Sequence, residues 1–144
     1  MNIGEFLKRF EGGKGTIRIG GDMECVFKDS CPQLSCTGKR NLRRALYHKI
    51  RYIHVANDGK IAISISPFYD ESRDFTLLEL LAVSMISDIQ IDSDIRLVGL
   101  DAILAFIKTN NPILDRVVKC VSIIEGAMII TLTPSIDDIL SMLT

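Results

Sequence analysis

The chain of 144 residues lacks tryptophan, contains four cysteines and four prolines, and has no long hydrophobic run. Four cysteines (Cys25, Cys31, Cys36 and Cys120) are too few for a disulfide scaffold, so we expect reduced thiols and a cytosolic or nuclear location. No stretch approaches the ~20 apolar residues of a membrane-spanning helix, so we expect no transmembrane segment. The first ten residues also lack the apolar core of a signal peptide.

An excess of charge of one sign is also absent. The chain has 17 basic and 18 acidic residues, a formal net charge of −1, which excludes binding driven by overall charge. The charges are nevertheless unevenly distributed, because residues 1–60 contain twelve basic and six acidic residues and residues 61–144 contain five and twelve. With 47% hydrophobic residues the chain is not a disordered one, and its length fits one domain over residues 1–144.

The hydrophobic patterns predict an α+β fold, a single compact domain of antiparallel β-hairpins with packed helices. Helical periodicity predicts short amphipathic helices at residues 2–10 and after Ser135, and further helices at 39–50, 76–87 and 101–108. Turn residues flanked by β-rich runs predict hairpins at 16–27, 53–65 and 116–133. Residues 29–38 and 67–75 have the composition of polar connections, and no internal repeat is visible.

A basic segment is the strongest functional signal. Lys39, Arg40, Arg43, Arg44, Lys49 and Arg51 occur with no acidic residue among them. On a helix, Arg40, Arg43, Arg44 and Tyr47 share one face, and Tyr47 could stack on a base or lie at an interface. We therefore expect an anion- or partner-binding site formed by Lys39, Arg40, Arg43, Arg44, Tyr47 and Arg51. Its ligand would be a nucleic acid, an anionic membrane surface or an acidic protein surface. An ordinary solvated helix face is the alternative.

The C-terminal helix suggests a role in assembly. Its apolar stripe of Ile136, Ile139, Leu140 and Leu143 needs a surface to cover it. The opposite charges of the two halves would let one copy bind the next in a head-to-tail contact. The leading hypothesis is therefore a non-enzymatic, self-associating intracellular binding or assembly protein. Such contacts form rings or open arrays, as in viral matrix-like or accessory proteins, and the isoleucine-rich, tryptophan-free composition fits a viral or AT-rich genome.

Two hypotheses from other classes remain open. Cys31, Cys36, His48 and His54 have a spacing close to that of a zinc site with two cysteines and two histidines, which would make the protein a zinc-dependent nucleic-acid-binding regulator. A small enzyme with a cysteine nucleophile is the third hypothesis, although the sequence shows no catalytic signature and we predict neither a catalytic residue nor a cofactor. The glycines near Lys14 do not match a phosphate-binding loop, and the aspartates from Asp88 to Asp101 do not match an EF-hand.

Overall fold

The computed structural model of the chain describes residues 1–11, 15–20, 23–28, 31–33, 44–134 and 136–143. In its first half, α1 (Ile3–Arg9) is followed by strands β1 (Gly15–Ile19), β2 (Met23–Lys28), β3 (Cys31–Gln33), β4 (His48–Val55) and β5 (Ile61–Tyr69). In its second half, α3 (Leu77–Val83) precedes β6 (Asp88–Ile91) and β7 (Ile95–Val98). Then follow α4 (Leu100–Lys108), the 3-10 helix η1 (Pro112–Asp115), β8 (Val118–Ile124), β9 (Ala127–Leu132) and α5 (Ile136–Met142).

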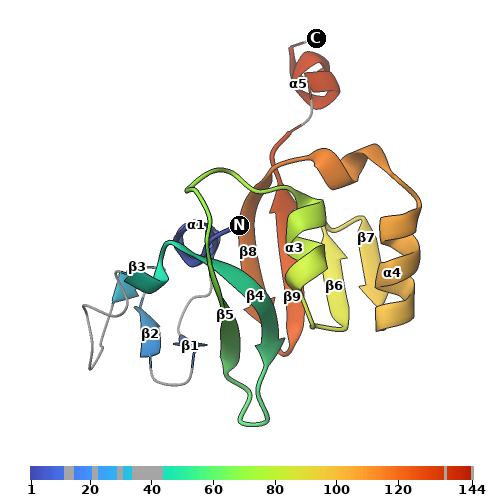
Figure 1. Cartoon of the computed structure of the whole chain (residues 1–144). Helices are drawn as coiled ribbons and strands as arrows, with labels where there is room; N and C mark the ends of the chain where they lie inside the picture. Colours follow the sequence, from blue (N-terminus) through green and yellow to red (C-terminus); the bar gives the residue numbers. More distant parts are fainter. Residues whose placement is uncertain (12–14, 21–22, 29–30, 34–43, 135, 144) are drawn as a thin grey trace.

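Each half of the chain forms one β-sheet (Figure 1). The first sheet has the strand order β3-β2-β1-β5-β4 and the second the order β7-β6-β9-β8. The three predicted hairpins, β1–β2, β4–β5 and β8–β9, pair antiparallel, as do β2–β3 and β6–β7, but the central pairs β1–β5 and β6–β9 are parallel. The α+β fold is thus confirmed, with mixed rather than purely antiparallel sheets.

The two halves repeat the same four-strand topology, to which the first half adds β3, and no sequence pattern revealed this repeat. In each half a seven-residue helix precedes one hairpin, and the first strand of that hairpin pairs in parallel with the last strand of the second hairpin. The hydrogen bonds repeat as well: Gly20 N–H donates to Ile63 O at 2.9 Å, and Asp92 N–H donates to Ile130 O at the same distance. Residues 17, 19 and 63 therefore correspond to residues 89, 91 and 130.

Helices α1 and α3 connect the two halves in equivalent ways. The N-cap residues Asn2 and Thr76 form antiparallel bridges to the start of the second hairpin of their own half, Asn2 to Lys49 in β4 and Thr76 to Val117 just before β8. The C-cap residues form parallel bridges to the opposite half, Phe10 with Val121 in β8 and Ser84 with Ile53 in β4. One continuous core results. Its fully buried members include Phe6, Ile19, Ile53, Phe75, Leu80, Ile91 and Ile130.

Several element boundaries differ from the sequence-based predictions. The helix expected over 39–50 is wrong at its end, because β4 begins at His48; of its described residues only Arg44 and Ala45 are helical. Ile50 N–H donates to Met1 O and the segment pairs with β5, so tertiary pairing overrides the local helical pattern. The predicted polar connections contain strand residues 31–33 and 67–69, and α3 ends at Val83 rather than at Ser87.

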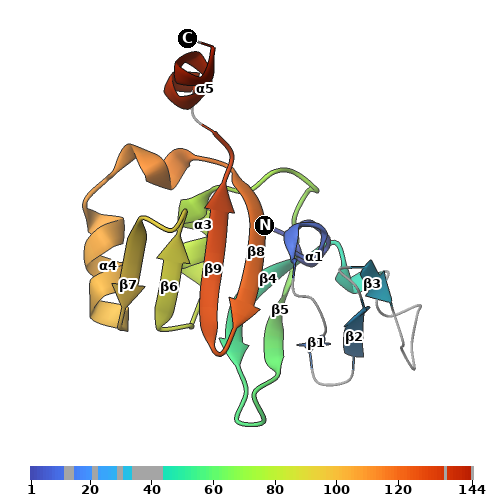
Figure 2. The same ribbon diagram turned by 180° about the vertical axis from the view of Figure 1, so that it is seen from behind.

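Helix α5 lies beyond the end of β9, apart from both sheets in the two opposite views of the molecule (Figures 1 and 2). It follows β9 after the short connection through Thr133 and Pro134, and Ser135, its predicted cap, lies outside the described residues. The predicted C-terminal helix is therefore present. No helix in the described part of the chain is long and apolar enough to cross a membrane.

Candidate functional site

The structure places part of the predicted basic site. Lys39, Arg40 and Arg43 lie outside the described residues, whereas Arg44, Tyr47, Lys49 and Arg51 are exposed. Arg51 extends over the ring of Tyr52, with its guanidinium carbon 5.7 Å from the ring centroid. Because β4 begins at His48, the described part of the site is a turn leading into a strand and not one helix face. Lys49 lies in a separate hollow that Met1 and Arg73 also line.

Tyr47 is held at the junction between this turn and the end of β5. Its N–H donates to Arg44 O at 3.3 Å, and its carbonyl oxygen accepts the N–H of Asp70 at 3.0 Å. The backbone is therefore fixed on both sides, while the side chain is 59% exposed. A fixed backbone beneath an exposed aromatic ring is suitable for ligand contact, because less conformational entropy is lost on binding.

Two aromatic residues lie beside Tyr47: His48, predicted only as a candidate zinc ligand, and Tyr69, which was not predicted as a site residue. His48 is the register partner of Tyr69, and their rings are 4.5 Å apart. His48 is oriented by Ser66, whose carbonyl oxygen is 2.8 Å from Nδ1. Tyr69 is 70% exposed, as is Phe68. We call Arg44, Tyr47, His48 and Tyr69 the aromatic–basic surface. The sequence Pro67-Phe68-Tyr69, which places two aromatic residues at the end of β5, was the signal from which this surface could have been predicted.

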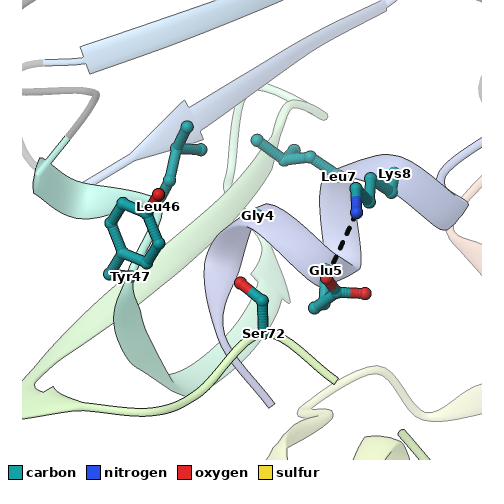
Figure 3. Close-up of a pocket in the computed structure, with 7 residues that line it drawn as sticks. All are labelled: Gly4, Glu5, Leu7, Lys8, Leu46, Tyr47 and Ser72. Carbon is teal, nitrogen blue, oxygen red and sulfur yellow. Dashed lines mark hydrogen bonds and ion pairs between the residues drawn. The ribbon is translucent and has the colours of Figure 1, made fainter. Parts of the chain in front are cut away.

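Two adjoining hollows meet at Tyr47 and Ser72. The first, the α1 hollow, has a volume of about 370 Å³ and lies between α1 and the segment of Leu46 and Tyr47 (Figure 3). Apart from Tyr47 and Ser72 it is lined by Gly4, Glu5, Leu7, Lys8 and Leu46. The second is lined by Tyr47, Tyr69, Asp70, Glu71 and Ser72. Gly4 allows the close approach of α1 to Leu46, because its N–H donates to Leu46 O at 2.9 Å and an added Cβ would lie 3.3 Å from that oxygen.

The acidic groups near these hollows are mostly paired. The Met1 ammonium lies 2.5 Å from Asp70 Oδ2, and this hydrogen bond lowers the pKa of Asp70 although burial opposes ionisation. Burial also disfavours the charged form of Glu5, but hydrogen bonds from Arg9 and Lys8 outweigh it and lower the pKa of the carboxyl group. Both carboxylates are thus already neutralised by cations of the same chain. Glu71 is exposed at the rim.

The predicted metal ligands are only partly described. Cys36 lies outside the described residues, Cys31 is in β3, and both histidines are in β4. His48 contacts Ser66 and Tyr69 as above, whereas Nδ1 of His54 is buried without a hydrogen-bond partner. Among the described residues no three histidine, cysteine or acidic side chains are grouped as a metal would require.

The remaining reactive side chains, two cysteines and two aspartates, lie in strands or bond to neighbouring strands. Cys120 is a half-buried free thiol in β8, and Cys25 is part of β2. In the acidic stretch, Asp88 forms an ion pair with Arg96 at 3.2 Å, and Asp92 accepts the N–H of Leu132 at 2.9 Å. These aspartates connect neighbouring strands. Comparisons of the chain with known protein families, with curated proteins and with solved structures found no match.

Proposed function

We propose that this is a non-enzymatic intracellular binding protein that holds single-stranded RNA on the aromatic–basic surface. The observation that supports this function best is the pair of exposed rings, Tyr47 and Tyr69, which line one hollow beside the acid-free basic segment. Stacking on aromatic rings together with phosphate neutralisation is how proteins bind single strands without sequence preference. An anionic membrane would use the cations equally well, but two tyrosines that line the same hollow favour a ligand with flat bases.

The binding energy divides into two parts that can be measured separately. Each base stacked on a tyrosine contributes about 1–3 kcal/mol, and this contribution depends little on salt. Each phosphate contact made by Arg or Lys releases counterions, so the affinity falls as salt rises. Tyrosine variants should therefore weaken binding with an unchanged salt dependence. Charge variants should weaken binding and also flatten the salt dependence.

Fluorescence anisotropy with a labelled oligouridine tests this proposal across a salt series. We expect Arg40, Arg43 and Arg44 changed together to Glu to abolish binding at physiological salt, and Tyr47→Ala with Tyr69→Ala to weaken it at least tenfold. The matched control changes Arg96, Lys108 and Lys119 to Glu, which alters the charge equally on the other half of the chain and should leave binding nearly unchanged. RNA binding that survives the first variant would refute the proposal. Binding to phosphatidylserine vesicles without RNA binding would assign the surface to membranes.

A zinc-dependent regulator is the alternative from a different class. It is supported by the spacing of Cys31, Cys36, His48 and His54 and by the unpartnered Nδ1 of His54. Elemental analysis of protein purified without chelators decides between the two functions. One zinc per chain, lost when Cys36→Ser is introduced, would favour the regulator.

A further inference from the structure

Helix α5 exposes apolar side chains that the rest of the molecule leaves uncovered. Ile139 is 47% exposed, Leu140 56% and Met142 80%, and Leu143, just after the helix, is 78% exposed. Helical aliphatic residues at such spacing are normally covered, because burying each one stabilises the folded state. In the two views of the molecule α5 lies apart from both sheets. These side chains therefore lack the burial that their pattern indicates.

The sequence of α5 matches the two helices that are buried. Helices α1, α3 and α5 each have seven residues and follow Asn, Thr or Ser. In all three the first residue is Ile or Leu, the third is acidic, the fourth is a large apolar residue and the fifth is Leu. The apolar residues are Ile3, Phe6 and Leu7 in α1, Leu77, Leu80 and Leu81 in α3, and Ile136, Ile139 and Leu140 in α5.

The residues at these shared positions are buried in α1 and α3 but exposed in α5. Phe6 and Leu80, at the fourth position, are both 0% exposed, and Leu7 and Leu81, at the fifth, are 7% and 3% exposed. Helices α1 and α3 bury these residues where the hairpins of the two halves meet. Helix α5 follows β9 as α3 follows β5, so it is the next helix of the same series. A helix of this type that is exposed in one copy is suited to packing against another copy.

The charges identify the surface that would receive α5. Its sequence contains two acidic residues, Asp137 and Asp138, and no basic residue, so two α5 helices would repel each other. The exposed apolar side chains around α4, namely Val98, Leu100 and Leu104, lie near acidic Asp101. The α1 hollow instead has Leu7 and Leu46 in its lining, and its acidic lining residue, Glu5, is already neutralised by Arg9 and by Lys8, which is 72% exposed at the rim. Arg44, two residues before Leu46, is exposed as well.

We propose that α5 of one copy docks into the α1 hollow of a second copy, with Ile139 and Leu140 against its apolar lining and the acidic α5 segment beside the basic residues Lys8 and Arg44. The contact joins two different surfaces, so it is heterologous and can form a ring or an open array. It would place the acidic C-terminal segment of one chain against the basic half of the next. The contact shares Arg44 and Tyr47 with the proposed RNA-binding surface, so it is tested with nucleic acid removed.

Sedimentation velocity over a concentration series, with nucleic acid removed, tests the contact. We expect the unmodified chain to associate as its concentration rises, and Leu140→Asp to reduce association at least tenfold. The matched control is Leu104→Asp on α4, because Leu104 is 55% exposed and the chemical change is identical. It should associate like the unmodified chain. A monomeric unmodified chain at all concentrations, or association lost only in Leu104→Asp, would overturn the proposal.

Charge reversal tests which surface receives the helix. The double variant Lys8→Glu/Arg44→Glu should lose association, as should Asp137→Lys/Asp138→Lys. The quadruple variant restores opposite charges across the contact and should regain it. Far-ultraviolet circular dichroism and thermal melting confirm that each variant is folded. A quadruple variant that associates no better than the double variants would show that α5 docks elsewhere. RNA binding is measured in Leu140→Asp as well. Unchanged RNA binding in that variant would show that association can fail while the proposed function holds.

Discussion

At the scale of single residues, Glu5 illustrates how a buried charge is held in place. Its side chain is 7% exposed, and Arg9 Nη1 donates to Glu5 Oε2 at 2.6 Å. Arg9 also donates to Val118 O at 3.1 Å, pairs with Asp74, and has its guanidinium carbon 5.2 Å from the Phe75 ring centroid. One side chain therefore neutralises a buried carboxylate and ties α1 to both β8 and the segment before α3. Arg9 stabilises the fold largely because, without it, Glu5 would be a buried carboxylate that has lost its main ion-pair partner.

Replacing Arg9 with Met should accordingly lower the free energy of unfolding by about 2–4 kcal/mol at pH 7, near the lower end of the range for breaking a buried pair. In the unmodified chain the pKa of Glu5 lies below its ordinary value. The stabilisation that this carboxylate contributes is therefore complete above the ordinary pKa and is lost as the pH falls through the lowered pKa. Without Arg9, burial would raise the pKa above its ordinary value, so protonation as the pH falls from 7 to 4 would relieve the penalty. The difference between the two proteins should thus shrink on acidification.

Urea unfolding of both proteins between pH 7 and pH 4 measures this difference. Lys8→Met is the matched control, because Lys8 contacts the same carboxylate at 3.4 Å but is 72% exposed. Its effect should stay below about 1 kcal/mol, as for an ordinary surface ion pair. A penalty in Arg9→Met that does not change with pH would indicate that lost packing, rather than the charge of Glu5, is responsible.

At the scale of secondary-structure elements, the β8–β9 hairpin is determined by its turn. Glu125 and Gly126 have φ angles of 52° and 82°, so both central residues are in the left-handed region, as the type I′ turn requires. An added Cβ at Gly126 would meet nothing within 4 Å. Only the backbone conformation therefore requires glycine there. Glu125 adopts the same unfavourable region without being glycine or asparagine.

Substitutions at the two turn positions should consequently have opposite effects. Gly126→Ala should lower the free energy of unfolding by about 1 kcal/mol, and Glu125→Asn should raise it by a few tenths of a kcal/mol to about 1 kcal/mol. Both residues are exposed, so neither change disturbs the core. Chemical denaturation of the two variants provides the measurement. Effects of the same sign would show that the turn is not of this type in solution.

The elements that could be predicted from the sequence are those with local causes. Two hairpins are predicted by their turn residues, Asn57 to Gly59 and Glu125-Gly126. Helix α1 is predicted by the spacing of Ile3, Phe6 and Leu7. The start of β4 at His48 has no local cause, because it depends on pairing with β5 and on the bond from Ile50 to Met1. For the same reason Tyr47 was predicted as a site residue while its neighbour Tyr69, brought there by the register of β4 and β5, was missed.

At the scale of the whole molecule, the two halves cannot be considered separate units. Each of α1 and α3 bridges from its own half to a strand of the other, through the equivalent hydrogen bonds from Glu11 N–H to Val121 O and from Met85 N–H to Ile53 O. The repeat was missed in the sequence because the equivalent positions, such as Ile63 and Ile130, are mostly isoleucines in an isoleucine-rich chain, and such matches do not stand out. A shared core between repeated halves implies that they stabilise one another. The molecule should then unfold as one unit.

The distribution of tyrosine allows a direct test of this coupling. The chain has no tryptophan, and its three tyrosines lie between residues 47 and 69, so tyrosine fluorescence reports on the first half alone. Ile19 and Ile91 occupy equivalent positions in β1 and β6 and are both 0% exposed. Replacing either with Ala should lower the free energy of unfolding by about 2–5 kcal/mol, because each change leaves a cavity in the same core.

The informative variant is Ile91→Ala, in the half that lacks tyrosine. If the halves unfold together, its urea midpoint should fall equally by tyrosine fluorescence and by far-ultraviolet circular dichroism, which reports on both halves. Ile19→Ala is the control, because it should shift both signals whether the two halves unfold together or independently. A tyrosine transition that stays in place while the dichroism transition moves in Ile91→Ala would mean that the halves unfold independently. The bridges of Phe10 and Ser84 would then be too weak to couple the two sheets.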